Sequence, residues 1–142
     1  MYINVDNIPD MLKGLKQWVL WKKVTVREKE KKVPYAITGQ EASVIDVSTW
    51  GNFGDIINTY SRNSSEYSGI GFVFSKNDPF VGVDFDDCIV DGKITPSVEE
   101  WVNRFASYTE VSQSSTGIHI ICQGNLPVSG KRKDDIEMYQ QS

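Results

Sequence analysis

Apolar positions along the chain fall into short blocks rich in β-branched and aromatic residues, a pattern typical of strands. These blocks predict strands at residues 18–26, 69–74, 80–85, 108–112, 118–122 and 136–139. The charged run 27–32 predicts the loop of a hairpin whose second strand is 32–35. A turn signal at 76–79 separates two of the blocks, so 69–74 and 80–85 are expected to be neighbouring strands.

Two other segments have apolar residues at intervals of three and four, the spacing of a helix with one buried face. Ser48 is the expected N-cap of a helix at about 49–62, and Pro96 is expected at the first position of a helix that continues to Phe105. The mixed order predicts an α+β fold with a mostly antiparallel sheet, in a single domain spanning residues 1–142. Because the last strand ends almost at the final residue, we expect a domain truncated at its C-terminal end.

The composition is that of a globular domain. The chain has 142 residues, of which 39% are hydrophobic and 11% aromatic, enough for a core without disulfides. Cys88 and Cys122 are far apart and do not form a zinc-binding spacing, and no run of eighteen apolar residues occurs. We therefore expect a cytoplasmic protein with no membrane partner.

Charge is distributed unevenly along the chain, whose net charge is -4. Residues 1–40 contain eight Lys or Arg and four acids, a net charge of +4, which leaves -8 for the rest. An acidic centre with a basic flank suits an enzyme that binds cations and contacts phosphate. For the run 27–32 taken alone, a solvated hairpin explains the charges equally well.

Asp84 and Asp86 stand at the end of an apolar strand. Since side chains alternate along a strand, both carboxylates should lie on one face, with Val83 and Phe85 on the other. Neighbouring carboxylates repel each other unless a cation lies between them, and Mg²⁺ prefers oxygen ligands of this kind. An isolated Asp-x-Asp is a weak motif, but unpaired acids beside a buried strand are costly, which favours a cation site. A calcium EF-hand loop is excluded because Ile89 stands where that loop requires glycine.

Two further strands each carry one polar residue in an apolar context. His119, the only histidine, follows the turn Ser-Gln-Ser-Ser-Thr-Gly at 112–117, and Glu137 alternates with Ile136 and Met138. The hydroxyl and backbone N–H groups of such a turn can bind phosphate together with the imidazole. Taken singly, a strand histidine is more often structural, and a turn of this composition is more often ordinary.

A compact basic cluster, Lys131, Arg132 and Lys133, precedes Glu137. It is a candidate contact for phosphate or template, and a solvated loop tip is the alternative. A P-loop is excluded because the glycine spacing before Lys131 is wrong and Arg132 replaces the required Ser or Thr. Neither a serine-hydrolase elbow nor a His-Glu-x-x-His zinc motif occurs.

The order of these motifs resembles that of the archaeo-eukaryotic primase superfamily. The matching residues are Asp84-x-Asp86, then Ser114-x-x-Gly-x-His119, then the pair Ile136-Glu137. The pattern is most like that of the primase-polymerase domains of phages, plasmids and other mobile elements. The similarity runs through nearly the whole chain and includes the segments 18–21, 32–35, 48–50, 69–74 and 81–86.

This resemblance implies a primase-polymerase fold, in which an RRM-like, mostly antiparallel sheet is joined to an N-terminal α/β module. It implies that Asp84, Asp86 and Glu137 are catalytic and bind two Mg²⁺ or Mn²⁺ ions. The implied activity is template-dependent nucleotidyl transfer by a DNA primase/polymerase in the replication of a mobile element. Nucleoside triphosphates, a DNA template or primer and a replicative helicase are the implied partners.

The resemblance also assigns the triphosphate contacts. Ser114 and His119 would bind the phosphates of the incoming nucleotide, with Lys32 added by a weaker analogy. Relatives usually continue after the third motif with an Arg-containing strand, whereas only 140–142 follow it here. The missing strand leaves a non-catalytic DNA- or protein-binding module derived from the primase fold as an alternative. A metal-dependent nuclease is a third, since two-metal sites can also cleave phosphodiesters. The Ser114 and His119 pattern speaks against the nuclease.

Overall fold

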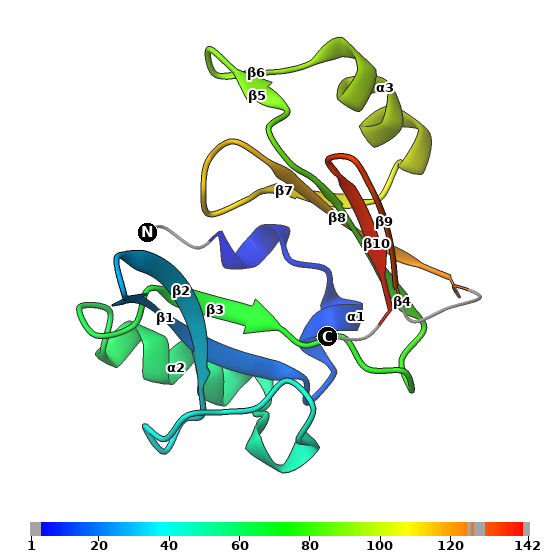
Figure 1. Cartoon of the computed structure of the whole chain (residues 1–142). Helices are drawn as coiled ribbons and strands as arrows, with labels where there is room; N and C mark the ends of the chain where they lie inside the picture. Colours follow the sequence, from blue (N-terminus) through cyan, green and yellow to red (C-terminus); the bar gives the residue numbers. More distant parts are fainter. Residues whose placement is uncertain (1–3, 125, 127–129, 141–142) are drawn as a thin grey trace. The chain divides into compact units, whose positions relative to one another are not determined.

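A computed structural model describes residues 4–124, 126 and 130–140 of the chain. The chain divides into two compact units, Met1–Val73 and Phe74–Ser142, and each has its own sheet (Figure 1). All strand pairs of the described residues are antiparallel. The expected α+β class with a mostly antiparallel arrangement is therefore confirmed.

The first unit has a three-stranded sheet with the order β2-β1-β3. Its elements are η1 (Val5–Asn7), α1 (Asp10–Lys13), β1 (Trp18–Val26), β2 (Lys29–Tyr35), η2 (Val47–Thr49), α2 (Phe53–Arg62) and β3 (Gly69–Phe72). The first four residues of β1, 18–21, are all buried, because helix α2 packs against β1 and β3. The rings of Trp18 and Phe53 meet edge to face at 4.9 Å in this core.

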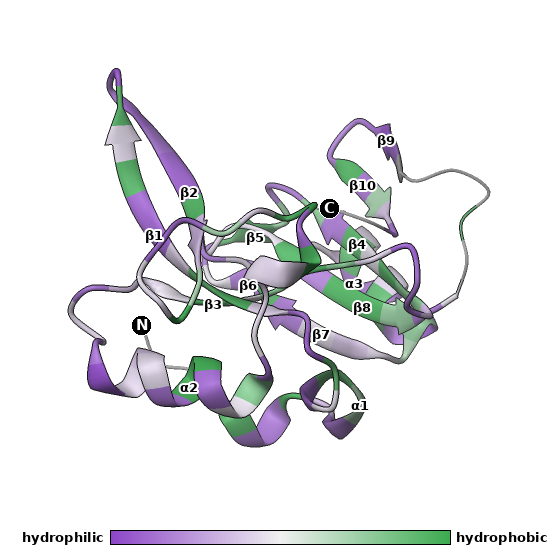
Figure 2. Cartoon of the chain, turned by 90° about the horizontal axis from the view of Figure 1, so that it is seen from below, coloured by the Kyte–Doolittle hydropathy of each residue, from purple (hydrophilic) through white to green (hydrophobic). Residues whose placement is uncertain are grey.

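The β1–β2 hairpin is longer than expected. Strand β2 begins at Lys29, so the turn consists of Arg27 and Glu28 alone, whose φ angles of 51° and 64° suit a two-residue hairpin turn. The lysines expected in a loop are therefore paired residues of a strand, with Lys32 opposite Lys23. The expected loop at 27–32 was wrong because residues 29–32 are all exposed, so no apolar alternation marks the strand. Figure 2 shows the hydrophilic character of β2 and of the turn.

Helix α2 begins later than expected. Its N-cap is Asn52, whose side-chain oxygen accepts a hydrogen bond of 2.8 Å from the backbone N–H of Asp55. Ser48, the expected cap, lies in η2. The backbone of Gly51 pairs with that of Trp18, which keeps the residues before Asn52 extended. The expected start at residue 49 was therefore four residues early.

The second unit has a five-stranded sheet with the order β7-β8-β4-β10-β9 and a separate two-stranded ribbon of β5 and β6. Its elements are β4 (Phe80–Phe85), β5 (Ile89–Val90), β6 (Lys93–Ile94), α3 (Pro96–Phe105), β7 (Tyr108–Val111), β8 (Ile118–Gln123), β9 (Gly130–Lys133) and β10 (Ile136–Tyr139). Pro96 is the first residue of α3, as expected. Strand β9 was not expected, since the basic cluster was assigned to a loop tip or a phosphate contact rather than to a strand.

The expected pairing of 69–74 with 80–85 was wrong. Strand β3 pairs with β1 in the first unit, whereas β4 pairs with β8 and β10 in the second. A tight turn does join them, since the Asp78 carboxylate accepts hydrogen bonds from the N–H groups of Ser75 and Phe80, each at 2.8 Å. A local turn signal identifies this bend, but it does not determine which sheet each flanking strand joins.

One face of the five-stranded sheet carries the core of the second unit. Val83, Phe85, Ile118 and Ile120 are buried there, and apolar residues of α3 pack against them. Trp101 of α3 lies at the margin, with 42% of its surface exposed. The opposite face of the same sheet carries polar side chains.

Candidate active site

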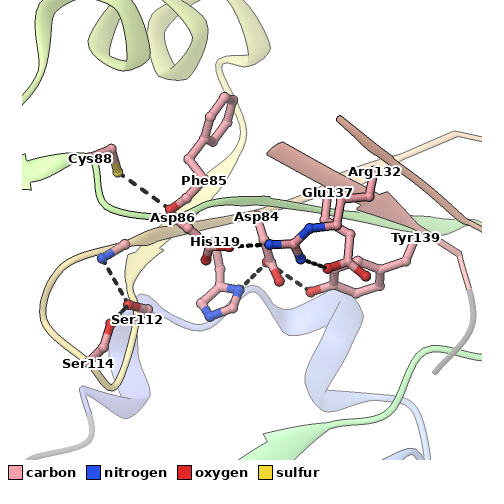
Figure 3. Close-up of polar contacts among 11 residues, drawn as sticks. Asp84, Phe85, Asp86, Cys88, Ser112, Ser114, His119, Arg132, Glu137 and Tyr139 are labelled. Atoms are coloured by element: carbon pink, nitrogen blue, oxygen red, sulfur yellow. Dashed lines mark hydrogen bonds and ion pairs between the residues drawn. The ribbon is translucent and has the colours of Figure 1, made fainter. Parts of the chain in front are cut away.

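A row of polar residues crosses the five-stranded sheet. The strand register places Glu110 of β7 opposite His119 of β8, His119 opposite Asp84 of β4, Asp84 opposite Glu137 of β10, and Glu137 opposite Arg132 of β9. Directly opposed residues in antiparallel strands lie on the same face, with Cβ atoms about 5 Å apart. Four of the residues expected at the site, His119, Asp84, Glu137 and Arg132, therefore share one transverse row with Glu110, which we call the polar row (Figure 3).

Asp84 lies at the middle of the polar row and is held by two partners. Its Oδ1 atom is in contact with Nδ1 of His119 and accepts a hydrogen bond of 3.1 Å from the hydroxyl group of Tyr139. The Asp84 side chain is 21% exposed and that of His119 is 33% exposed. Because Nδ1 is engaged by a carboxylate, the imidazole ring has a fixed orientation.

The Tyr139 ring reaches Asp84 by lying over a glycine. Tyr139 is opposite Gly82 in the register, and a Cβ atom at Gly82 would collide with the tyrosine ring. Phe74 packs edge to face against the same ring, with 4.9 Å between centroids. Burial, and then the neighbouring Asp84 carboxylate, raise the pKa of Tyr139, so its hydroxyl stays a hydrogen-bond donor.

Arg132 bridges the other two acids. Its Nη1 atom donates to Oε2 of Glu137 at 2.8 Å, and its Nη2 atom donates to Oδ2 of Asp86 at 3.0 Å. The three side chains are between 40% and 56% exposed. Partial desolvation lowers the pKa of Arg132, but the hydrogen bonds and charges of Asp86 and Glu137 outweigh this and leave the pKa raised. The guanidinium thus neutralises a pair of carboxylates that would otherwise repel each other.

The segment between β7 and β8 presents a chain of hydroxyl groups. Ser112 Oγ lies 2.8 Å from Ser114 Oγ, which in turn lies 2.8 Å from Thr116 Oγ1. Ser112 Oγ also accepts a hydrogen bond of 3.0 Å from the backbone N–H of Gly117. These hydroxyl groups can donate to the oxygens of an anionic ligand.

Gly117 lets this segment approach strand β4 closely. A Cβ atom at position 117 would lie 2.8 Å from the carbonyl oxygen of Phe85 and 3.0 Å from Ser112 Oγ, closer than side-chain atoms normally come. The carbonyl oxygen of Thr116 accepts hydrogen bonds from the N–H groups of Cys88 and Ile89, which follow β4. The glycine between Ser114 and His119 is therefore a packing requirement.

The basic candidates divide into separate groups. Lys131 and Lys133 lie opposite Met138 and Ile136, so they occupy the face of β9 opposite to Arg132. Lys32 belongs to β2 of the first unit, where its Nζ atom lies 4.8 Å from the centroid of the Trp21 ring. The register therefore joins only Arg132 of these four to the polar row.

The donor chemistry fits divalent cations. Within 4–124, 126 and 130–140, no three His, Cys, Asp or Glu side chains are arranged closely enough to hold a metal ion in their present rotamers. Asp84 is instead engaged by His119 and Tyr139, and Asp86 and Glu137 are engaged by Arg132. Asp84 and Glu137 nevertheless lie opposite each other on two adjacent strands, Asp86 follows directly after β4, and the guanidinium of Arg132 already lies between Asp86 and Glu137. This is an oxygen-rich environment of the kind that Mg²⁺ and Mn²⁺ prefer.

Sequence reasoning missed two members of this face and the pairing of a third. Glu110 is opposite His119, and its carboxylate accepts a hydrogen bond of 2.8 Å from Tyr108. Tyr139 is the last residue of the expected strand 136–139, but it was not among the expected site residues. Alternation along the strands could have placed both residues, because residues two apart on a strand share a face. Tyr139 is two residues from Glu137, and Glu110 is two residues from Tyr108. The ion pairs of Arg132 depend on β9, which the sequence pattern did not predict.

The chain is similar to a named phage protein. No family model matches the chain. The chain is 36% identical over 135 aligned positions to a protein of Nitratiruptor phage NrS-1 named DNA primase-polymerase. The match confirms the resemblance to phage primase-polymerases. It covers 87% of this chain but 18% of the phage protein, so the chain spans about a fifth of that primase-polymerase.

Residues of the three motifs that carried the resemblance lie together in the polar row. The motifs that carried the resemblance, at Asp84, His119 and Glu137, are the ones that the strand register brings side by side.

None of the helices among the described residues is both long and apolar enough to cross a bilayer.

Proposed function

We propose that the chain supplies the catalytic site of a template-dependent nucleotidyltransferase, a DNA primase/polymerase that acts in the replication of a phage, plasmid or other mobile element. The observation that carries this proposal is the polar row, where residues of three separate motifs lie side by side on three adjacent strands. The name of the phage relative supports the same activity. A replicative helicase is the expected partner of the whole protein.

The acids and the hydroxyl-rich segment have distinct roles in this proposal. Asp84, Asp86 and Glu137 would hold two Mg²⁺ or Mn²⁺ ions, which promote attack of a 3′-hydroxyl oxygen on the α-phosphorus and stabilise the leaving pyrophosphate. Ser114 donates a hydrogen bond to the triphosphate, and His119 in its protonated form donates from an imidazole fixed by Asp84. Phosphoryl transfer of this kind depends mainly on positioning and charge stabilisation, which such a rigid sheet provides.

The basic residues complete the assignment. Lys32 is proposed to contact the triphosphate, and Lys131 and Lys133 to contact the nucleic-acid backbone at the edge strand β9. Contacts of this type are electrostatic and weaken as salt concentration rises. Replacing Lys131 or Lys133 by glutamine should therefore reduce the salt dependence of template binding without changing which base is incorporated.

Primer extension by the full chain tests the catalytic proposal. The assay compares the wild type with the double variant Asp84→Asn, Asp86→Asn in the presence of Mn²⁺, deoxynucleoside triphosphates and a primed template. We expect at least a ~100-fold loss of extension, since even indirect disruption of a metal site commonly costs 10- to 100-fold. Glu100→Gln is a matched control, because this acid is exposed on α3 and lies outside the polar row. Extension that survives in the double variant would refute the proposal.

A non-catalytic DNA-binding module is the second candidate. It is favoured by one observation, that Asp86 and Glu137 are already neutralised by the protein's own Arg132. Fluorescence anisotropy with single-stranded DNA, combined with the extension assay, separates the two. Tight binding by a folded chain without any nucleotide incorporation would favour the module. Metal-dependent shortening of the primer without triphosphates would identify a nuclease instead.

A further inference from the structure

Arg132 forms ion pairs with two acids of the candidate active site. Among the described residues of Phe74–Ser142, it is the only Lys or Arg with ion pairs to two acids, and each of its terminal nitrogens serves a different carboxylate. A fork that grips one carboxylate with two parallel bonds is the usual strong arrangement for arginine. Here the guanidinium stands between Asp86 and Glu137, the place that a bridging cation would take.

We propose that Arg132 is an internal counter-ion of the acidic site, which competes with a divalent cation for the oxygens of Asp86 and Glu137. This inference rests on the proposed function, because Asp86 and Glu137 are two of its three proposed metal ligands. Arg132 is accordingly a positioning residue. In the metal-free protein it holds two repelling carboxylates together, and a bound cation takes over that role.

The competition follows from charge and exposure. The guanidinium lies between Asp86 and Glu137, where a bridging divalent ion would also lie, and two positive charges at such short range repel each other. The Arg132 side chain is 56% exposed and belongs to β9 at the edge of the sheet. Exposed ion pairs contribute little free energy, so the guanidinium can swing away from the acids at small cost.

The displaced guanidinium acquires a second role. Its flexible side chain keeps it near the polar row, where the phosphate groups of a nucleotide would bind. Arginine is suited to phosphate because its planar donors match two phosphate oxygens. A phosphate ligand that binds Arg132 also releases the two acids for the cation, so phosphate and cation should each strengthen the binding of the other.

Calorimetric titration of Mn²⁺ into the full chain, without nucleotide, tests the competition. Arg132→Gln removes the competitor, and we expect it to tighten Mn²⁺ binding by about three- to ten-fold, in line with the modest strength of exposed ion pairs. Arg132→Lys, which offers one ammonium group to two acids, should lie between this variant and the wild type. A residue that only maintained the fold would give weaker Mn²⁺ binding when replaced.

Lys133→Gln is the matched control. It removes the same charge from the same strand, but Lys133 lies on the opposite face. If Lys133→Gln tightened Mn²⁺ binding equally, the gain would come from the lower net positive charge of the protein and not from the contacts of Arg132. That result would overturn the proposal. Unchanged or weaker binding in a folded Arg132→Gln protein would overturn it too, as would an Arg132→Lys protein that binds no more tightly than the wild type.

The same titration separates this inference from the proposed function. If the wild type binds Mn²⁺ and Asp86→Asn abolishes binding, the proposed metal site is supported, whatever the result for the Arg132 variants. If neither wild type nor Arg132→Gln binds Mn²⁺, the metal ligands themselves are wrong and both proposals fall. A tighter Arg132→Gln protein that cannot extend a primer would support the counter-ion and contradict the polymerase.

Discussion

The hydroxyl group of Tyr139 donates a hydrogen bond of 3.1 Å to Oδ1 of Asp84 on the adjacent strand. The same carboxylate oxygen contacts His119 on the strand at its other side. One oxygen atom thus connects strands β10, β4 and β8. Because the tyrosine pKa is raised, its hydroxyl keeps the proton that this bond requires. The Asp84 side chain is therefore fixed by its neighbours before any ligand binds.

Tyr139→Phe removes this hydrogen bond while keeping the ring. We expect a loss of about 1.5–3 kcal/mol in the free energy of unfolding, which is what hydrogen bonds to charged groups contribute. We also expect slower primer extension, because Asp84 would adopt more than one rotamer. Urea denaturation and single-turnover extension measure the two effects.

Tyr108→Phe provides the control for that variant. Tyr108 also donates to a carboxylate, at 2.8 Å, but its partner Glu110 is exposed and outside the proposed metal ligands. The stability loss should be smaller than for Tyr139→Phe, and extension should change less. Equal effects of the two substitutions on extension would contradict a special role for the Tyr139–Asp84 bond.

Gly82→Ala tests the space that Tyr139 occupies. The added Cβ would overlap the tyrosine ring, so the ring must move and its hydroxyl loses Asp84. Overpacking of this kind costs about 1–3 kcal/mol, measured as a change in the urea midpoint. Gly71→Ala is the control, because its Cβ would lie 3.6 Å from Val19, an ordinary contact in a strand. A Gly82→Ala protein as stable as Gly71→Ala would show that the ring yields freely.

The polar row shows how far the sequence could predict the site. Alternation along each strand correctly placed Asp84 and Glu137 on the faces opposite their apolar neighbours, because period-two patterning follows from strand geometry alone. Alternation does not determine which strands lie next to each other in the sheet. Pairing β4 with β8 and β10 depends on long-range contacts, and the local turn at 76–79 wrongly suggested β3 as a partner.

Two errors in the fold have the same physical origin. Residues 29–31 of β2 and 131–133 of β9 are charged and exposed, so the hydrophobic pattern that identifies a strand is absent from these two segments. Each instead owes its existence to backbone pairing with a neighbouring strand, β1 or β10. The position of Arg132 beside Glu137 follows from the pairing of β9, which explains why its ion pairs could not be predicted.

Gly117→Ala should disturb the hydroxyl-rich segment. A Cβ at 2.8 Å from the Phe85 carbonyl oxygen forces the segment away from β4, and Ser114 moves with it. If Ser114 binds the triphosphate, nucleotide affinity should fall by about ten-fold, the equivalent of one lost hydrogen bond. Calorimetry with a deoxynucleoside triphosphate and Mn²⁺ measures this.

Gly124→Ala is the matched control for Gly117→Ala. Its added Cβ would lie 3.7 Å from Val81, an ordinary distance, and it follows the other end of β8. Nucleotide affinity should be unchanged in this variant. Undiminished affinity in a folded Gly117→Ala protein would exclude Ser114 from the nucleotide site.

Stability should fall at high pH because of Tyr108. Burial, and then the charge of Glu110, raise the pKa of Tyr108 above its usual value of 10.0. The folded protein therefore keeps the phenolic proton at a pH where the unfolded chain releases it. Above about pH 10, the unfolded state binds fewer protons than the folded state, and the free energy of unfolding decreases with pH by linkage. Below that pH the contribution of this group is constant.

Urea denaturation between pH 8 and pH 11 checks this dependence, a range set by the ordinary tyrosine pKa of about 10. The decline should be shallower in Tyr108→Phe than in the wild type, since phenylalanine has no proton to release. Tyr2 and the remaining tyrosines are kept in both proteins, so the difference between the two slopes isolates Tyr108. Parallel slopes would mean that the Tyr108 hydroxyl titrates alike in the folded and unfolded chains, and that burial beside Glu110 does not favour its neutral form.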